Sequence, residues 1–512
     1  MSKNNFAVEM YNITKKFPGV IANDSVDFKL TKGEIHALLG ENGAGKTTLV
    51  KCLYGMYQID NGKILLDGKQ VEMSNPSIAI EHGIGMVHQH FMLVPPFTVA
   101  ENIVLGSEPS NFGMFDYKRA VKEVTNLSER YGLNVDPEAK VQDISVGMQQ
   151  RVEILKALYR GADILILDEP TAVLTPQEVD ELISIMKSLT DQGKSIIFIT
   201  HKLKEVKKIS DQVTVIRRGK VMDTVKTDSA TTDDLAKMMV GREVVLSVDK
   251  NDADPGEVIL QVENLRAKND RGLSALNGVS FEVRRGEILG VAGVEGNGQS
   301  ELSEVLNGLR NLDEGTIVFK NQDISKYSTR DIIQAGVSYI PEDRLSRGLI
   351  LDFTLYENMI LGDHTNPPYA NGWNINYNKV RKEVRKLIKD YDVRTPNENV
   401  LAKSLSGGNQ QKVIIAREFA REHDLLIAAQ PTRGVDVGAI EFIHKSIIEQ
   451  RDSGKGVLLI SLELDEILSL SDKIAVMYEG EIVEIMDSKD ASEEKLGLLM
   501  AGTTKKAMGG GQ

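Results

Sequence analysis

The sequence is poor in cysteine and lacks long hydrophobic runs. Its 512 residues include one cysteine, Cys52, so no disulfide framework holds the chain together. No apolar run approaches the ~18 residues that a membrane-spanning helix needs. Residues 1–6 also lack the apolar core of a secretory signal. These absences predict a cytoplasmic chain that reaches a membrane only through partner proteins.

Basic residues are outnumbered, with 61 Lys and Arg against 74 Asp and Glu and a net charge of −13. A sequence-independent nucleic-acid binder needs a basic surface, so we expect no nucleic-acid partner. The content of 41% hydrophobic and 26% charged residues is typical of a globular chain. Because single cores rarely grow beyond about 250–300 residues, the length predicts at least two domains.

The chain repeats itself at long range. Residues 33–40, Gly-Glu-Ile-His-Ala-Leu-Leu-Gly, recur as residues 286–293, Gly-Glu-Ile-Leu-Gly-Val-Ala-Gly, at an offset of 253. Farther along, Ser145 matches Ser406 at an offset of 261. The second half has therefore gained eight residues, which we place in the Asn-, Pro- and Gly-rich stretch 366–378. A repeat of this length indicates a duplicated domain rather than a solenoid unit.

A polar, aperiodic stretch separates the two copies. The expected division is a first domain at 1–245, a linker at 246–256, a second domain at 257–502 and a flexible tail at 503–512. Within each half, apolar strands such as residues 164–167 and 195–199 alternate with amphipathic helices. This alternation predicts an α/β fold with a parallel sheet that is covered on both faces.

A phosphate-binding loop occurs in the first half. Residues 40–47, Gly-Glu-Asn-Gly-Ala-Gly-Lys-Thr, fit the pattern G-x4-G-K-[ST] between an apolar strand and a helix. The glycines let backbone N–H groups approach phosphates, and the helix N-terminus favours negative charge. We therefore expect ATP and Mg²⁺ as ligands. The predicted ATP contacts of this loop are Gly40, Glu41, Asn42, Gly43, Ala44, Gly45, Lys46, Thr47 and Thr48.

An acidic pair, Asp168 and Glu169, follows the apolar residues 164–167. Carboxylates at the end of a buried strand are costly unless they serve a cation or a reaction. Asp168 can hold Mg²⁺ together with Thr47, and Glu169 can polarise an attacking water. After a phosphate loop at this distance, the pair predicts nucleotide hydrolysis.

A serine-glycine signature lies before the acidic pair, as Ser145, Val146 and Gly147. The second half has Ser406, Gly407, Gly408, Asn409 and Gln410. With the loop and the acidic pair, these residues resemble the ATP-binding domain of ABC transporters, twice over nearly the whole chain. The resemblance implies that each half has a RecA-like α/β core, an antiparallel β subdomain and a helical subdomain. It also implies that each ATP lies between the phosphate loop of one half and the signature of the other.

The same resemblance assigns roles to further residues. Phe17 occupies the position of an aromatic residue that stacks on adenine, with core packing as the alternative. Gln89 matches the loop glutamine that contacts Mg²⁺ and water, and His201 matches the histidine that contacts the γ-phosphate. Asp436 matches the aspartate of the D-loop, where the first half has Thr175.

The second half departs from the pattern at matching positions. Its phosphate loop carries Gly293, Gly296, Gly298, Gln299 and Ser300, with glutamine in place of Lys46. The other replacements are Ala429 and Gln430 for the acidic pair, Leu462 for His201 and Glu342 for Gln89. In a head-to-tail pairing, the complete loop faces the intact signature and the altered loop faces Ser145 to Gly147. We therefore expect one active and one degenerate ATP site.

Tandem ATP-binding chains occur among importers and among ABC-F translation factors. The latter usually keep both acidic pairs and a long charged linker, which this sequence lacks. A regulatory scaffold without hydrolysis is opposed by the complete first site. Residues 428–431 and 296–299 look more like nucleoside importers that work with a basic-membrane-protein-type lipoprotein than like monosaccharide importers. We favour a nucleoside importer, with a ribose- or galactose-type importer as the alternative.

The resemblance also implies partners. The chain is expected at the cytoplasmic face of the cell membrane, bound to two permease subunits and served by a substrate-binding lipoprotein. Because Gln89 and Glu342 differ, the two halves offer unlike docking surfaces, which suggests two non-identical permeases.

Overall fold

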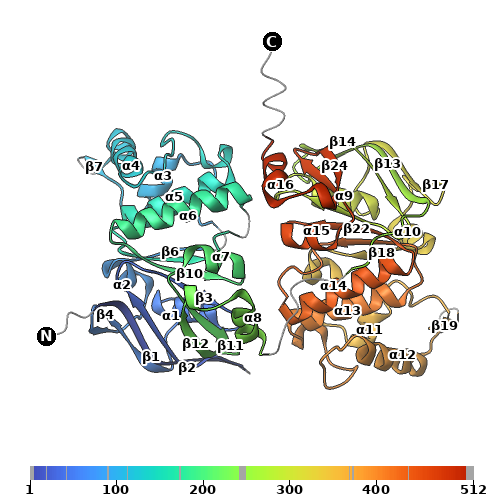
Figure 1. Cartoon of the computed structure of the whole chain (residues 1–512), viewed down its shortest axis with the longest axis horizontal. Helices are drawn as coiled ribbons and strands as arrows, with labels where there is room; N and C mark the ends of the chain where they lie inside the picture. The colour runs from blue at the N-terminus through green and yellow to red at the C-terminus, as the bar shows by residue number, and fades with distance from the viewer. Residues whose placement is uncertain are drawn as a thin grey trace, which may run out of the picture. The chain divides into compact units, whose positions relative to one another are not determined.

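The computed structural model describes residues 5–18, 20–41, 43–88, 91–111, 114–171, 174–241, 250–367, 369–371, 374–435 and 437–502. The chain divides into two compact units, Met1–Val244 and Val245–Gln512. Each unit contains an antiparallel sheet, a mostly parallel sheet and a group of helices (Figure 1). The expected tail and the start of the expected linker lie outside the described residues. No helix in the described part of the chain is long and apolar enough to cross a membrane.

Two sheets form the first unit. The antiparallel sheet has the order β2 (Val20–Thr31), β1 (Phe6–Phe17), β4 (Asn61–Leu66), β5 (Lys69–Val71). The main sheet has the order β12 (Lys220–Lys226), β11 (Gln212–Arg217), β3 (Ile35–Leu39), β10 (Ser195–Thr200), β9 (Ile164–Asp168), β6 (Ile84–Val87). Strands β3, β9 and β10 are buried along their whole length, which confirms the expected strands at 164–167 and 195–199.

The register of the main sheet brings distant segments to one edge. Thr200 of β10 lies opposite Leu39 of β3, and Ile199 lies opposite Asp168 of β9. The phosphate loop, the acidic pair and His201 therefore follow the carboxyl ends of three neighbouring parallel strands, where ligands bind in open α/β sheets.

The helices of the first unit form two groups. One group packs around the main sheet: α1 (Lys46–Leu53), α2 (Pro76–Glu81), α6 (Pro176–Asp191), α7 (Leu203–Ile209) and α8 (Thr232–Val240). The other consists of α3 (Val99–Val104), α4 (Tyr117–Tyr131) and α5 (Val146–Tyr159), beside the hairpin of β7 (Ser110–Asn111) and β8 (Met114–Phe115). Helices α3, α4 and α5 pack on one another, and α5 begins at the first signature.

The second unit repeats this plan. Its antiparallel sheet has the order β14 (Ser274–Arg284), β13 (Val258–Lys268), β16 (Glu314–Phe319), β17 (Gln322–Asp323). Its main sheet has the order β18 (Val337–Ile340), β21 (Leu425–Ala429), β22 (Gly456–Ser461), β15 (Ile288–Ala292), β23 (Lys473–Tyr478), β24 (Glu481–Asp487). The helices are α9 (Gln299–Leu306), α10 (Thr329–Ala335), α11 (Leu355–Met359), α12 (Tyr377–Asp390), α13 (Gly407–Ala420), α14 (Val437–Asp452), α15 (Leu464–Leu470) and α16 (Glu493–Met500), with a small hairpin of β19 (Ala370–Asn371) and β20 (Asn374–Ile375).

The structure corrects where the eight extra residues lie. The capping threonines of α3 and α11, Thr98 and Thr354, are already 256 residues apart, so three insertions precede them. The first residues of α4 and α12, Tyr117 and Tyr377, are 260 apart. Only four insertions can therefore fall in the region that contains residues 366–378. Residues 366–378 have the composition of a turn, which is why the insertion was expected there. The three residues inserted before Thr354 lie in a stretch that contains a helical turn, Arg344–Gly348, and has no such composition.

Candidate functional site

The first phosphate loop is shaped by glycines with left-handed backbone. Gly43 and Gly45 have φ angles of 77° and 105°. A Cβ at Gly45 would lie 2.3 Å from the carbonyl oxygen of Ala22, so no larger residue fits there. Helix α1 begins at Lys46 without a side-chain cap. Its first N–H groups are therefore left to an anionic ligand.

Lys46 is buried beneath this loop. Its ammonium donates to the carbonyl oxygens of Gly40 at 2.6 Å and of Glu41 at 3.0 Å. Burial lowers its pKa, while the nearby carboxylates of Glu169 and Asp168 oppose that change. The cation is thus held at the loop before any phosphate arrives.

The acidic pair lies next to the loop. The hydroxyl of Thr47 donates to Asp168 Oδ1 at 3.3 Å, and His201 Nδ1 lies 3.1 Å from Glu169 Oε1. Burial, followed by the neighbouring Glu169, raises the pKa of Asp168. Burial also acts to raise the pKa of Glu169, but the hydrogen bond to His201 and the charge of Lys46 outweigh it and lower the pKa. Glu169 is therefore kept ionised, as a water-polarising group requires.

The backbone at the acidic pair is strained. Glu169 has a φ of 48°, and its N–H donates to the carbonyl of Ile199 at 3.0 Å. Left-handed backbone is uncommon outside glycine and is concentrated at functional sites. The bend directs the chain away from β9 at the end of the buried strand.

Thr47 and Asp168 are suited to a magnesium ion. A hydroxyl and a carboxylate already in mutual contact supply the oxygen ligands that Mg²⁺ prefers, with phosphates and waters completing its shell. The described residues contain no group of three or more His, Cys, Asp or Glu side chains placed to hold a metal. A cation bound through one carboxylate and a nucleotide needs no such cluster.

Phe17 lies at the end of β1 and is partly exposed. The edge of Tyr57 meets it, with the ring centroids 5.3 Å apart, and the ammonium of Lys15 lies 5.5 Å from its centroid. The ring is partly exposed, and its role in stacking on adenine stays a prediction. Three further predicted residues, Asn42, Gln89 and Asp436, lie outside the described residues.

The second phosphate loop keeps the backbone shape of the first. Gly296 and Gly298 have φ angles of 92° and 103°. Gln299 is buried in the place of the lysine, and a Cβ at Gly293 would lie 2.3 Å from its Nε2. Nε2 has no hydrogen-bond partner among the described residues. The loop is therefore formed, but it lacks the cation.

Side chains around the second loop are bound to one another. Ser300, at the position of Thr47, donates to Glu342 Oε2 at 2.7 Å, and Glu342 is paired with Arg433. Near the β13–β14 turn, Arg310 pairs with Asp270 at 2.7 Å. The N–H of Arg310 donates to the carbonyl of Glu304, as the N–H of Tyr57 does to that of Lys51, so Arg310 and Tyr57 hold equivalent positions. The Arg310–Asp270 ion pair of the second half therefore replaces the Phe17–Tyr57 aromatic pair of the first.

The acidic-pair segment of the second half also keeps its backbone. Gln430 has a φ of 48°, matching Glu169, and its N–H donates to Ile460 at 2.7 Å. Its Oε1 accepts from the N–H of Leu462 at 3.4 Å. Ala429, in place of Asp168, is buried and brings no polar atom. The two halves therefore share the bend, although only the first has the two carboxylates.

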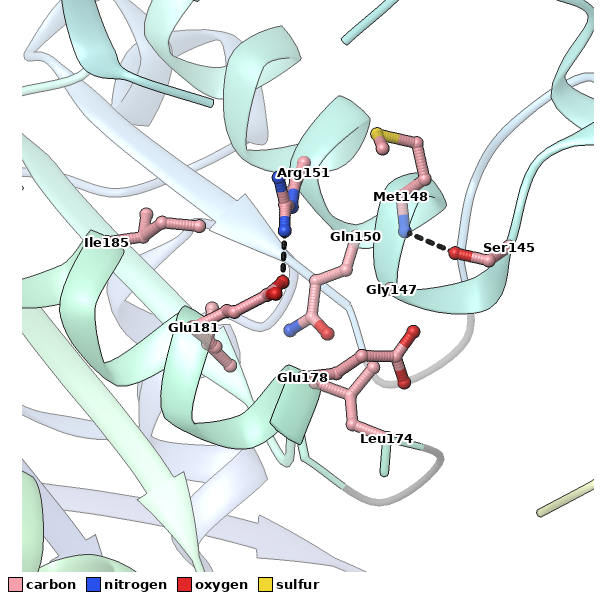
Figure 2. Close-up of a pocket in the computed structure, with 10 residues that line it drawn as sticks. Ser145, Gly147, Met148, Gln150, Arg151, Leu174, Glu178, Glu181 and Ile185 are labelled. Carbon is pink, nitrogen blue, oxygen red and sulfur yellow. Dashed lines mark hydrogen bonds and ion pairs between the residues drawn. The ribbon is translucent and has the colours of Figure 1, made fainter. Parts of the chain in front are cut away.

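The first signature starts α5 beside a cavity of about 270 Å³ (Figure 2). Ser145 caps the helix by accepting from the N–H of Met148 at 3.2 Å. A Cβ at Gly147 would lie 2.4 Å from Glu178 Oε1, so a carboxylate is packed against the signature. The buried side chain of Gln150 points toward α6, which carries Glu178 and Glu181. An acidic group here opposes the binding of a phosphate.

The second signature is arranged differently. Ser406 makes no cap to its own helix, and its hydroxyl accepts from Asn409 Nδ2 at 2.9 Å. Gln410 is buried and donates to the carbonyl of Ala402 at 3.1 Å. A Cβ at Gly407 would lie 2.8 Å from a nitrogen of Arg344. The group packed on this signature is therefore a cation.

Sequence reasoning missed several of these contacts. Asn23 is buried and donates to the carbonyl of Gly45 at 3.1 Å, and Tyr57 supports Phe17. Glu178 and Arg344 contact the two signatures. Each lies far along the chain from its partner, so no local pattern indicates the contact.

Both halves match the family described as ABC transporter, over residues 23–172 and 276–433. The chain belongs to the ABC transporter family. It is a tandem ABC ATPase, since the two matches fall in the two compact units. One solved structure, of an archaeal ribosome recycling factor in complex with a ribosomal stalk protein, has a TM-score of 0.59 at 18% identity and covers 93% of this chain and 90% of that one. At that identity the similarity supports the tandem fold alone.

Relatives at higher identity cover nearly the whole chain. The guanosine import ATP-binding protein NupO of Bacillus subtilis (strain 168) is 55% identical over 504 residues, covering 98% of this chain and 99% of that protein. The nucleoside import ATP-binding protein NupA of Lactococcus lactis subsp. cremoris (strain MG1363) is 52% identical, with coverage of 98% and 99%. The glucose import ATP-binding protein TsgD13 of Haloferax volcanii is 48% identical, with coverage of 97% and 96%.

Proposed function

We propose that this ABC ATPase powers the import of nucleosides through ATP hydrolysis at the phosphate loop of the first half. The observation that carries the ATPase site is the convergence of Lys46, Thr47, Asp168 and Glu169 at one sheet edge. The full-length identity of 55% to a guanosine import ATP-binding protein and of 52% to a nucleoside import ATP-binding protein supports the substrate class. A glucose import relative at 48% keeps the monosaccharide alternative open.

The chemistry is assigned to the first half as follows. Lys46 leaves the carbonyls of Gly40 and Glu41 to neutralise charge on the β- and γ-phosphates. Glu169, ionised and oriented by His201, accepts a hydrogen bond from the attacking water and aligns that water with the γ-phosphate. Thr47 and Asp168 would hold Mg²⁺, which would supply further charge neutralisation.

The second half is proposed to supply a signature rather than a second hydrolytic site. Its loop has Gln299 for the lysine, and Ala429 and Gln430 for the carboxylates. Each of these losses typically costs orders of magnitude in phosphoryl transfer. In the head-to-tail pairing typical of the family, Ser406 and Gly407 complete the active site, and Ser145 and Gly147 face the degenerate one.

The direct test is Glu169→Gln, which keeps the shape of the side chain and removes the charge. Hydrolysis by the transporter, purified through a tag on this chain, should fall at least ~10²-fold, and ATP should remain bound after exchange into nucleotide-free buffer. The matched control is Gln430→Glu at the equivalent second-half position. It should leave the rate within about twofold, since Gln299 and Ala429 remain unchanged. Full activity in Glu169→Gln would contradict the assignment.

The substrate and partners call for a separate experiment. We propose two non-identical permease subunits and a substrate-binding lipoprotein, because Gln89 and Glu342 differ at the positions that face the membrane subunits in this family. A strain that lacks this chain should lose uptake of labelled nucleosides and keep uptake of ribose and galactose. The reverse pattern would select the monosaccharide alternative. Co-purification of one permease species in two copies would contradict the unequal pair.

A further inference from the structure

A guanidinium lies against the second signature. Arg344 is partly buried, and its Nη1 donates to the carbonyl of Arg433 at 2.7 Å. A Cβ at Gly407 would lie 2.8 Å from Nη2, and one at Gly434 would lie 3.0 Å from Nη1. A Cβ at either position would therefore displace the guanidinium from the place that it occupies.

The arginine stands in a stretch that is three residues longer in the second half than in the first. Asn102 and Asn358 are equivalent, since each bonds both the N–H and the carbonyl of the residue eight positions earlier, Val94 or Ile350. Ile350 lies ten positions after Ile340, the end of β18 (350 − 340), whereas Val94 lies seven positions after Val87 (94 − 87). The three additional residues belong to this stretch of the second half.

The stretch around Arg344 is held by its own hydrogen bonds. It forms a π-helical turn, Arg344–Gly348, a conformation that often marks functional positions. The carboxylate of Asp343 accepts from the N–H groups of Leu345 at 2.8 Å and Ser346 at 3.1 Å, and Leu349 donates to the carbonyl of Arg344 at 2.9 Å. The backbone from which the guanidinium extends is therefore fixed on both sides.

The equivalent positions of the first half differ together. Val146 stands in place of Gly407, and Val173 stands in place of Gly434. The charged group packed on the first signature is Glu178, against Gly147. An arginine thus lies against two glycines at the second signature, whereas a carboxylate lies against Gly147 at the first.

We propose that Arg344 is a positioning residue for ATP hydrolysis, which holds the Ser406–Gly407 signature in place and sets a permanent positive charge beside it. The inference rests on the proposed function, in which that signature completes the active site. A guanidinium remains charged at any physiological pH, and its planar fork contacts two segments at once. At the first signature, the side chain that lies against Gly147 is the carboxylate of Glu178, and the nearby guanidinium of Arg151 is paired with Glu181.

The test compares two arginines of the same turn. Arg344→Ala should lower the ATPase rate of the transporter at saturating ATP roughly tenfold, while binding of trinitrophenyl-ATP stays within about twofold, since the first phosphate loop is untouched. Arg344→Lys keeps the charge without the fork and should lie between these values. The matched control is Arg347→Ala, because Arg347 pairs with Glu304 at 2.6 Å and not with the signature. It should leave both readouts within about twofold.

A double mutant tests the contact itself. Gly407→Ala alone should be damaging, because its Cβ would meet the guanidinium at 2.8 Å. With Arg344→Ala that obstruction is gone, so the double mutant should lose less activity than the product of the two single losses. Additive losses would show that the residues do not act through this contact and would overturn the inference.

Two further outcomes are decisive. Equal losses in Arg344→Ala and Arg347→Ala would reduce the role to general stability of the turn and overturn the proposal. If Arg344→Ala does not fold, as judged by thermal unfolding and trinitrophenyl-ATP binding, Arg344→Lys against Arg347→Lys gives the same comparison. Glu169→Gln is measured in parallel. Full activity in that variant refutes the proposed function and this inference with it, whereas its loss beside an active Arg344→Ala refutes this inference alone.

Discussion

The two phosphate loops have nearly the same backbone and different chemistry. The left-handed glycines of the first loop, Gly43 and Gly45, recur in the second as Gly296 and Gly298. The strained bend at the acidic pair recurs as well, with a φ of 48° at both Glu169 and Gln430. The side chains that would touch a nucleotide are replaced, and two of the substitutes, Ser300 and Gln430, bond to neighbouring protein groups.

The two signatures differ in the opposite sense. The second has Gly407 and a cation packed on it, whereas the first has Val146 and a carboxylate packed on Gly147. A duplicated fold can therefore keep its shape in both copies and divide the functional groups between them. Backbone conformation is maintained because the sheet and helix packing depend on it, whereas the side chains differ even where both are buried, as with Lys46 and Gln299.

The largest expected effect comes from making the first loop resemble the second. Lys46→Gln should reduce hydrolysis about 10²–10³-fold, because the buried cation that faces the phosphates is lost. The reciprocal change, Gln299→Lys, should create no second hydrolytic site while Ala429 and Gln430 remain. Steady-state ATPase rates of the purified transporter measure both. A substantial gain in Gln299→Lys would show that the second half lacks only the cation.

A pair of serine variants compares the signatures. Ser406→Arg should reduce hydrolysis at least ~10²-fold, because bulk and charge would face the phosphates bound to the first loop. Ser145→Arg should cost far less, although Ser145 lies in the same half as that loop. ATPase rates in the assembled transporter decide between them. If Ser145→Arg is the inactive variant, the active loop works with the signature of its own half or of a second copy.

The smallest expected effect concerns the base. Phe17→Ala should weaken ATP binding by about 1–3 kcal/mol, the scale of base–aromatic stacking. Leu273→Ala, an exposed position in the corresponding turn of the second half, should leave hydrolysis unchanged. Equilibrium binding of ATP to the purified variants provides the measurement. Unchanged affinity in Phe17→Ala would assign the ring to packing against Tyr57.

Much of the fold and the first site could be predicted because the signals are local in sequence. The continuous apolar strands before the loop and the acidic pair are buried strands β3 and β9, as expected. The prediction that all eight extra residues lie at 366–378 was wrong. Three of them fall in the stretch around Arg344, whose π-helical turn has no distinctive composition. Contacts such as Glu178 with Gly147 join residues 31 positions apart (178 − 147) across two helices, and no periodicity encodes them.

The sequence by itself determined the duplication, the α/β class and the inventory of groups that can handle phosphate in each half, since these depend on short runs and on residue identity. Tertiary structure decided which charge lies on each signature. It also decided that His201 contacts Glu169 and that the altered second loop keeps its conformation. The physical reason is range: a loop or a strand is specified by neighbours along the chain, whereas the electrostatic environment of a site depends on groups that only packing brings within a few ångströms.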